Sequence, residues 1–200
     1  MKRLYLICLG LLTAGLVSSA TGGMAVIQIL SEQYHVWGTI PTDSYDLNST
    51  NGSQISDSVR GFGGLASSGA GPTADHYSFA VTAFSNGFQG NSIIDASAEI
   101  TVFFQPAISG WLRPMITLYS DNVPGLSLHA SLIDMTAGAV LFDATSGDTF
   151  QFFTDVYDAH TYCLFIGAYS QVVKGGSGGS ASVAAEIPEP ACLPLLGFGG

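Results

Sequence analysis

The chain is poor in basic residues and in cysteine. Five of its 200 residues are Lys or Arg, against 15 Asp and Glu, which gives a formal net charge of −10. Such a surface repels phosphate backbones and anionic headgroups, so we expect no nucleic-acid partner and no peripheral binding to acidic membranes. Of the three cysteines only Cys163 lies away from the chain ends. An intradomain disulfide is therefore excluded, and stability must come from the core.

Helical periodicity is also missing, and the apolar pattern from residue 26 onwards has a period of two. Apolar and polar residues alternate over 77–84, 98–105 and 126–132, and turn residues separate these runs. Alternation of this kind indicates half-buried antiparallel strands. The other expected strands are 27–37, 115–119, 140–143, 150–156 and 162–171. About eight short strands predict an all-β, antiparallel β-sandwich with a jelly-roll-like arrangement.

Two stretches depart from this rhythm. Residues 41–75 are polar and rich in glycine, so we expect a long loop with short strands at 45–47 and 56–60 and a mobile segment at 67–72. Residues 174–186 begin with KGGSGGSA, a composition typical of a flexible tether. The sandwich domain is therefore predicted over residues 21–173.

The N-terminus has the pattern of a secretory signal peptide over residues 1–20. Lys2 and Arg3 precede an apolar run at 4–17, and the small residue Ala20 lies at the expected cleavage point. We therefore expect processing by signal peptidase and export. Removal of the leader leaves three basic residues against 15 acidic ones, a formal charge of −12.

The C-terminal residues 187–200 contain the triplet Pro188, Glu189 and Pro190, followed by mostly apolar residues. The prolines fix φ and lack a backbone donor, so the triplet is expected to be extended and accessible. This tail resembles the PEP-CTERM sorting signal of exported Gram-negative proteins, which exosortase recognises. The family's tail continues with a full transmembrane helix and a basic cluster. Here about ten residues follow, without Lys or Arg, against the roughly twenty that a span needs, so we expect an incomplete anchor.

The resemblance implies a non-enzymatic component of the cell surface or extracellular matrix, in an exopolysaccharide or biofilm context. It also implies transient association with the inner membrane and processing near Pro188–Pro190. The triplet would be read by the sorting enzyme and would not be a catalytic site of this chain.

Three motifs suggest enzyme chemistry, and each has a simpler interpretation. Ser177 lies in a GGSGG run that matches a nucleophile elbow but follows the last expected strand. Residues 61–66 match a relaxed dinucleotide fingerprint with no helix pattern after it. Asp155, Asp158 and His160 could act as acid and base or bind a metal, but the same residues are typical of a turn between strands. We therefore predict no enzymatic activity.

One polar segment could bind Ca²⁺. Asp43, Asp46, Asn48, Asn51 and Asp57 offer the oxygen ligands that this cation prefers, although the spacing of an EF-hand fails. Asx residues are also ordinary in turns, where they bond their own backbone. A calcium site stays an alternative, and no other cofactor is expected.

Aromatic residues provide a second functional hypothesis, a carbohydrate-binding β-sandwich. An exposed aromatic face could stack on sugar rings, whereas most aromatics of a two-layer fold belong to its core. The candidates for stacking are Trp37, Phe103 and Trp111, with Tyr34, Phe153, Phe165 and Tyr169 as further aromatics of the same strands and turns. Their convergence on one surface would distinguish the two interpretations.

Overall fold

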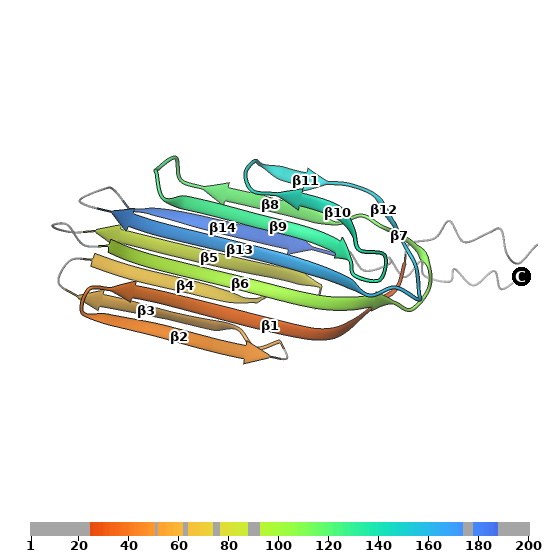
Figure 1. Cartoon of the computed structure of the whole chain (residues 1–200), viewed down its shortest axis with the longest axis horizontal. Coiled ribbons are helices and arrows are strands. Elements are labelled where there is room, and N and C mark those ends of the chain that lie inside the picture. The colour runs from red at the N-terminus through yellow and green to blue at the C-terminus, as the bar shows by residue number, and fades with distance from the viewer. Residues whose placement is uncertain are drawn as a thin grey trace, which may run out of the picture.

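The computed structural model describes residues 25–50, 52–61, 64–73, 77–87, 93–173 and 178–187, and these ranges contain strands and turns but no helix. Two six-stranded antiparallel sheets form two layers, and a two-stranded sheet lies at one end of the molecule (Figure 1). The predicted antiparallel β-sandwich is confirmed. The count of about eight strands is wrong, because the described residues form 14.

The first sheet contains, in spatial order, β10 (Ala139–Ala144), β9 (Leu126–Asp134), β13 (Tyr162–Val173), β6 (Ile93–Pro106), β1 (Ile27–Ile40) and β2 (Asp43–Thr50). The second contains β11 (Thr149–Gln151), β8 (Met115–Ser120), β14 (Gly179–Glu186), β5 (Ser78–Gly87), β4 (Gly64–Pro72) and β3 (Ile55–Gly61). The two-stranded sheet pairs β7 (Gly110–Leu112) with β12 (Thr154–Val156). Each large sheet thus has two strands more than a sheet of an eight-stranded jelly roll.

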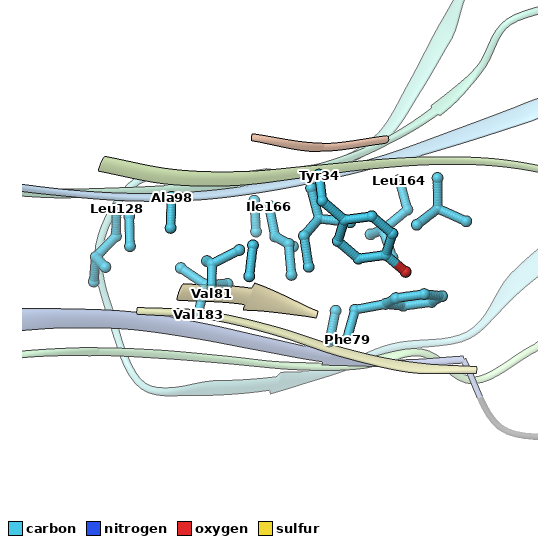
Figure 2. Close-up of a cluster of buried hydrophobic side chains, with 14 of the residues drawn as sticks. Tyr34, Phe79, Val81, Ala98, Leu128, Leu164, Ile166 and Val183 are labelled. Carbon is cyan, nitrogen blue, oxygen red and sulfur yellow. The ribbon is translucent and has the colours of Figure 1, made fainter. Parts of the chain in front are cut away.

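The core lies between the two large sheets and is built by alternation along each strand. In β6 the inward residues are buried, and the outward ones other than Ser97 are at least partly exposed, as the period of two requires. Figure 2 shows Tyr34, Leu164 and Ile166 of the first sheet facing Phe79 and Val183 of the second. The buried residues of β6 are Ile94, Ala96, Ala98, Ile100, Val102 and Phe104.

The last two strands lie in the middle of the two sheets. β13 pairs with β6 on one side and with β9 on the other, and β14 pairs with β5 and β8. The first sheet therefore joins β1, β2 and β6 to β9 and β10 only through β13. The C-terminal strands hold the earlier parts of the chain together.

A buried hydroxyl network crosses the sandwich at these central strands. Ser170 of β13 donates its hydroxyl to the carbonyl oxygen of Gly179 (2.8 Å) and accepts the backbone N–H of Ser85 in β5 (3.1 Å). The two serine hydroxyls also lie 2.7 Å apart, and both side chains are buried. Because every one of these groups is removed from water, each depends on its partners for hydrogen bonding.

The expected loop at 41–75 is largely strand. Within the described part of this stretch, residues 43–50, 55–61 and 64–72 form β2, β3 and β4, so the mobile segment expected at 67–72 is wrong. Glycine allows β3 and β4 to approach closely, since a Cβ at Gly71 would lie 2.9 Å from the Cα of Gln54.

The flexible tether expected over 174–186 is also wrong for its second part. Residues 179–186 form β14, which pairs with β5 on one side and β8 on the other. Its residues Ala181, Val183 and Ala185 are buried in the core. The small side chains of this segment fit the core, where a Cβ at Gly179 would overlap Val123. The folded body thus extends to Ile187, and residues 174–177 lie outside the described ranges.

Candidate functional site

The outer face of the first sheet brings together polar residues that are far apart in the sequence. The register aligns Asn48 of β2, His35 of β1, Glu99 of β6, Gly167 of β13 and His129 of β9 in one row across five strands. The two histidines are separated by three strand spacings, about 14 Å. This row is the centre of the candidate site.

Both histidines are held by carboxylates. His35 Nε2 lies 3.0 Å from Asp46 Oδ1, its Nδ1 lies 4.0 Å from Glu99 Oε2, and His129 Nε2 lies 2.9 Å from Asp143 Oδ1. The carboxylate side chains are 69%, 45% and 58% exposed, in the order Asp46, Glu99 and Asp143. Glu99 in the row and the two aspartates beside it are therefore carboxylates that are accessible to a ligand.

Aromatic side chains border this row on both sides. Trp37 and Tyr169 face each other across β6 with ring centroids 6.1 Å apart, and on the other side the ring of Phe165 lies 5.2 Å from that of His129. Tyr169 donates its hydroxyl to Asp95 (2.9 Å), which also accepts an N–H from Gln171 (2.7 Å). Burial of the ring and the Asp95 carboxylate raise the pKa of Tyr169 to about 12, so the hydroxyl stays protonated at neutral pH.

Two depressions adjoin at Glu99, and we call them together the outer-face trough. The first has a volume of about 350 Å³ and the second about 170 Å³. Gly167 keeps the second one open, because a Cβ there would lie 3.1 Å from Phe165 Cζ and 3.7 Å from Glu99 Cγ. The first is lined by Gln33, Tyr34, His35, Asn48, Ser49, Thr50, Glu99 and Thr101, and the second by Ser97, Glu99, Ser127, His129, Phe165, Gly167, Ala168 and Tyr169.

The structure separates the three aromatic candidates for sugar stacking. Trp37 borders the trough. Phe103 lies on the same face of the sheet, four residues after Glu99 in β6, and pairs with Cys163 of β13. Trp111 lies in β7 at the end of the sandwich, where its ring is 5.5 Å from that of Phe153. Tyr34 is only 1% exposed, so its ring belongs to the core and its place among the possible stacking residues is wrong.

His35, Glu99, His129 and Asp143 were not singled out from the sequence. Their signal is positional: each lies at a polar position of a strand, on the face that alternation turns outward. Only the strand order and register, which bring residues 35, 99 and 129 into one row, make them a cluster.

The acid and imidazole cluster that was the alternative to a turn at 155–160 does not assemble as such. Asp155 belongs to β12, and Asp158 accepts the hydroxyl of Ser109 (3.0 Å). His160 Nδ1 instead lies 2.6 Å from Oδ2 of Asp134, which is 26 residues earlier. Residues 158–159 form a turn, as the simpler interpretation of this segment predicted.

Asp134 is a buried carboxylate that ties two loops together. Its Oδ1 accepts the backbone N–H groups of Thr136 (3.0 Å) and Ala137 (2.9 Å), and its Oδ2 meets His160. Burial acts to raise the pKa of Asp134, but the hydrogen bonds of His160, Ala137 and Thr136 and the imidazole's charge outweigh it and lower this pKa. The arrangement fixes the turn after β9 against the start of β13.

The possible calcium ligands do not converge. Asp43 and Asp57 each accept the backbone N–H of the next residue, and Asp46 is engaged by His35. In the described part of the chain no three His, Cys, Asp or Glu side chains are grouped as a metal site. Asn51 lies outside that part.

Of the remaining sequence motifs, the structure describes only the ends of the glycine-rich one at 61–66. Gly61 pairs with Gly64 where β3 turns into β4, so a strand follows the glycines at the place where a dinucleotide site needs a helix N-terminus. Ser177, Pro188–Pro190 and the cleavage residue Ala20 lie outside the described residues.

Comparison with known proteins adds no relative. No protein-family model, curated protein or solved structure matches this chain. Among the described residues, no helix has the length and apolar character needed to cross a membrane.

Proposed function

We propose that this protein is a non-enzymatic, exported component of the cell surface or extracellular matrix that binds an extracellular polysaccharide along the outer-face trough. The trough itself carries the proposal. Sugars present hydroxyl groups and flat apolar C–H faces, so a glycan site needs polar partners beside aromatic rings. Here Asn48, Gln33 and Thr101 line the polar floor, and Trp37 and Phe165 lie at its borders.

A binding role suits this site better than catalysis. Glycoside hydrolysis needs a carboxylic acid whose pKa burial has raised, opposite a second carboxylate. Asp46, Glu99 and Asp143 are all substantially exposed, and two of them are hydrogen-bonded to imidazoles. Exposed carboxylates of this kind hold ligand groups by hydrogen bonds and charge.

The two chain ends support the proposed location. The leader that ends at Ala20 is the substrate of signal peptidase, and the Pro188–Glu189–Pro190 triplet is the substrate of an exosortase on the resemblance described above. The intact mass of the protein from the exported fraction tests this. A mass that begins near residue 21 and ends near Pro188–Pro190 supports sorting, and a retained tail contradicts it.

Glycan binding is tested on the full exported protein with a panel of extracellular polysaccharides and matched tryptophan variants. Trp37→Ala removes a ring from the trough, and we expect binding to weaken about tenfold or more. Trp111→Ala is the control, because this ring lies in β7 at the end of the sandwich. Gly167→Val should weaken binding as well, since the added side chain fills the second depression.

Two results would contradict the proposal. A panel without any binding would remove the glycan function. Equal losses for Trp37→Ala and Trp111→Ala, with Gly167→Val unaffected, would show that sugars bind elsewhere or without specificity.

A further inference from the structure

We propose that the outer-face trough selects a positively charged polysaccharide, one whose 2-amino sugars carry free, unacetylated amino groups. This inference rests on the proposed function. The depressions and their aromatic borders would bind a glycan, and the negative charge of the carboxylates would select which glycan binds. Asp46, Glu99 and Asp143 are the groups that would meet the ammonium groups of the ligand.

The carboxylates are spread across the outer face rather than gathered at one point. Glu99 lines both depressions, and Asp46 and Asp143 flank them through their contacts with His35 and His129. Asp46 belongs to β2 at one edge of the sheet, Glu99 to β6 near its middle, and Asp143 to β10 at the other edge. Glu99 is thus two strand spacings, about 10 Å, from Asp46 and three, about 14 Å, from Asp143. An extended polymer with repeated positive charges matches this distribution, whereas a single small cation does not.

The local hydrogen bonds leave part of each aspartate available. His35 contacts Oδ1 of Asp46, and His129 contacts Oδ1 of Asp143. Among the described residues no hydrogen bond reaches Oδ2 of either aspartate, and both side chains are more than half exposed. An ammonium group is a donor without acceptor capacity, so a carboxylate oxygen of this kind is its natural partner.

No Lys or Arg offsets these charges on the same sheet, and the basic groups beside the carboxylates are the imidazoles of His35 and His129. The six strands of the first sheet contain no Lys or Arg, and the two basic residues of the described ranges, Arg60 and Arg113, belong to β3 and to the segment after β7. The chain as a whole has a formal charge of −10. The field at the trough therefore attracts cationic polymers and repels polymers of uronic acids.

The inference is tested with three probes on the full protein: an oligomer of glucosamine, the same oligomer fully N-acetylated, and a uronic-acid oligomer of similar length. Near neutral pH the free amines of a glucosamine oligomer carry part of their positive charge, and N-acetylation removes it. We expect the glucosamine oligomer to bind about tenfold tighter than its acetylated form, with a preference that falls as salt is added.

Glu99→Gln keeps the shape of the trough and removes its central charge, so we expect the preference for the amine to fall about two- to fivefold. Asp148→Asn is the matched control, because it removes the same charge from an exposed turn beside β11 of the other sheet. This control should leave the preference unchanged.

The outcomes distinguish selection by charge from glycan binding itself. Equal binding of the amine and acetylated oligomers, or an equal effect of Glu99→Gln and Asp148→Asn, overturns the charge selection while glycan binding stands. Tightest binding of the uronic-acid oligomer overturns it as well. If none of the probes nor any panel polysaccharide binds, the proposed function fails too.

Discussion

Val183 provides a direct test of the last strand. It lies in the middle of β14, fully buried, in register with Val81 of β5 and Leu118 of β8. Val183→Ala removes two buried carbons, at about 0.8 kcal/mol each, and the unfilled cavity adds to this loss. We expect the free energy of unfolding to fall by about 2–3 kcal/mol, which corresponds to a Tm lower by about 5–10 °C in a domain of this size.

Urea denaturation followed by tryptophan fluorescence measures this change. Ser182→Ala is the matched control, because Ser182 is the adjacent residue on the outer face of the same strand and its loss should change stability by less than about 0.5 kcal/mol. If both variants had the same small effect, residues 179–186 would not be part of the core. The composition of the segment would then have indicated its structure correctly, as a tether.

Three further features are tested by substitution in the same denaturation assay. Ser170→Ala leaves the buried N–H and hydroxyl of Ser85 without their partner and should cost about 1–3 kcal/mol; an unchanged midpoint would contradict the network. Because the pKa of Asp134 is lowered from 3.8, this carboxylate stabilises the fold above that pH and loses its contribution as the pH falls through its lower folded value. Asp134→Asn should therefore be less stable at neutral pH and flatten the acid limb of the stability profile, and an unaltered profile would refute this. Gly125→Ala, at φ 91° with a Cβ against the carbonyl of Gln171, should destabilise more than Gly138→Ala, which has φ 66° but open space and an expected cost of about 1–2 kcal/mol.

The sequence predicted the fold class well because most strands alternate strictly. In β6 the residues from Ile94 to Val102 change between apolar and polar at every step, and this pattern is typical of a strand with one buried face. β4 and β14 were not predicted as strands. Their segments LASSGAGP and GSASVAAE consist of small residues, which are typical of loops and tethers when judged by composition.

Small residues are nevertheless suited to β4 and β14, where neighbouring segments approach closely. Gly71 and Gly179 lie where a Cβ would meet such a segment, and Ala185 pairs with the larger Phe79 of β5 and Ile116 of β8. Packing of this kind depends on which strand lies opposite. It cannot be read from a local pattern, because tertiary contact overrides propensity.

The candidate site was predictable only in its parts. Trp37 was recognised as an aromatic on a strand, but its partner Tyr169 is 132 residues away and comes beside it through two strand pairings. Likewise His160 was placed with the acids next to it in the chain, whereas its true partner is Asp134. Both contacts depend on strand order and register, and these cannot be derived from the pattern of a single sequence.

The position of β13 and β14 has a consequence for when this protein can fold. A chain is synthesised from its N-terminus, so the strands that complete both sheets are the last to appear, and until then β5, β6, β8 and β9 have open edges. Pairings over such sequence separations form slowly. For a chain exported as proposed, the incomplete body stays unfolded behind its leader during translocation, and the sandwich closes only after residue 187 has crossed the membrane.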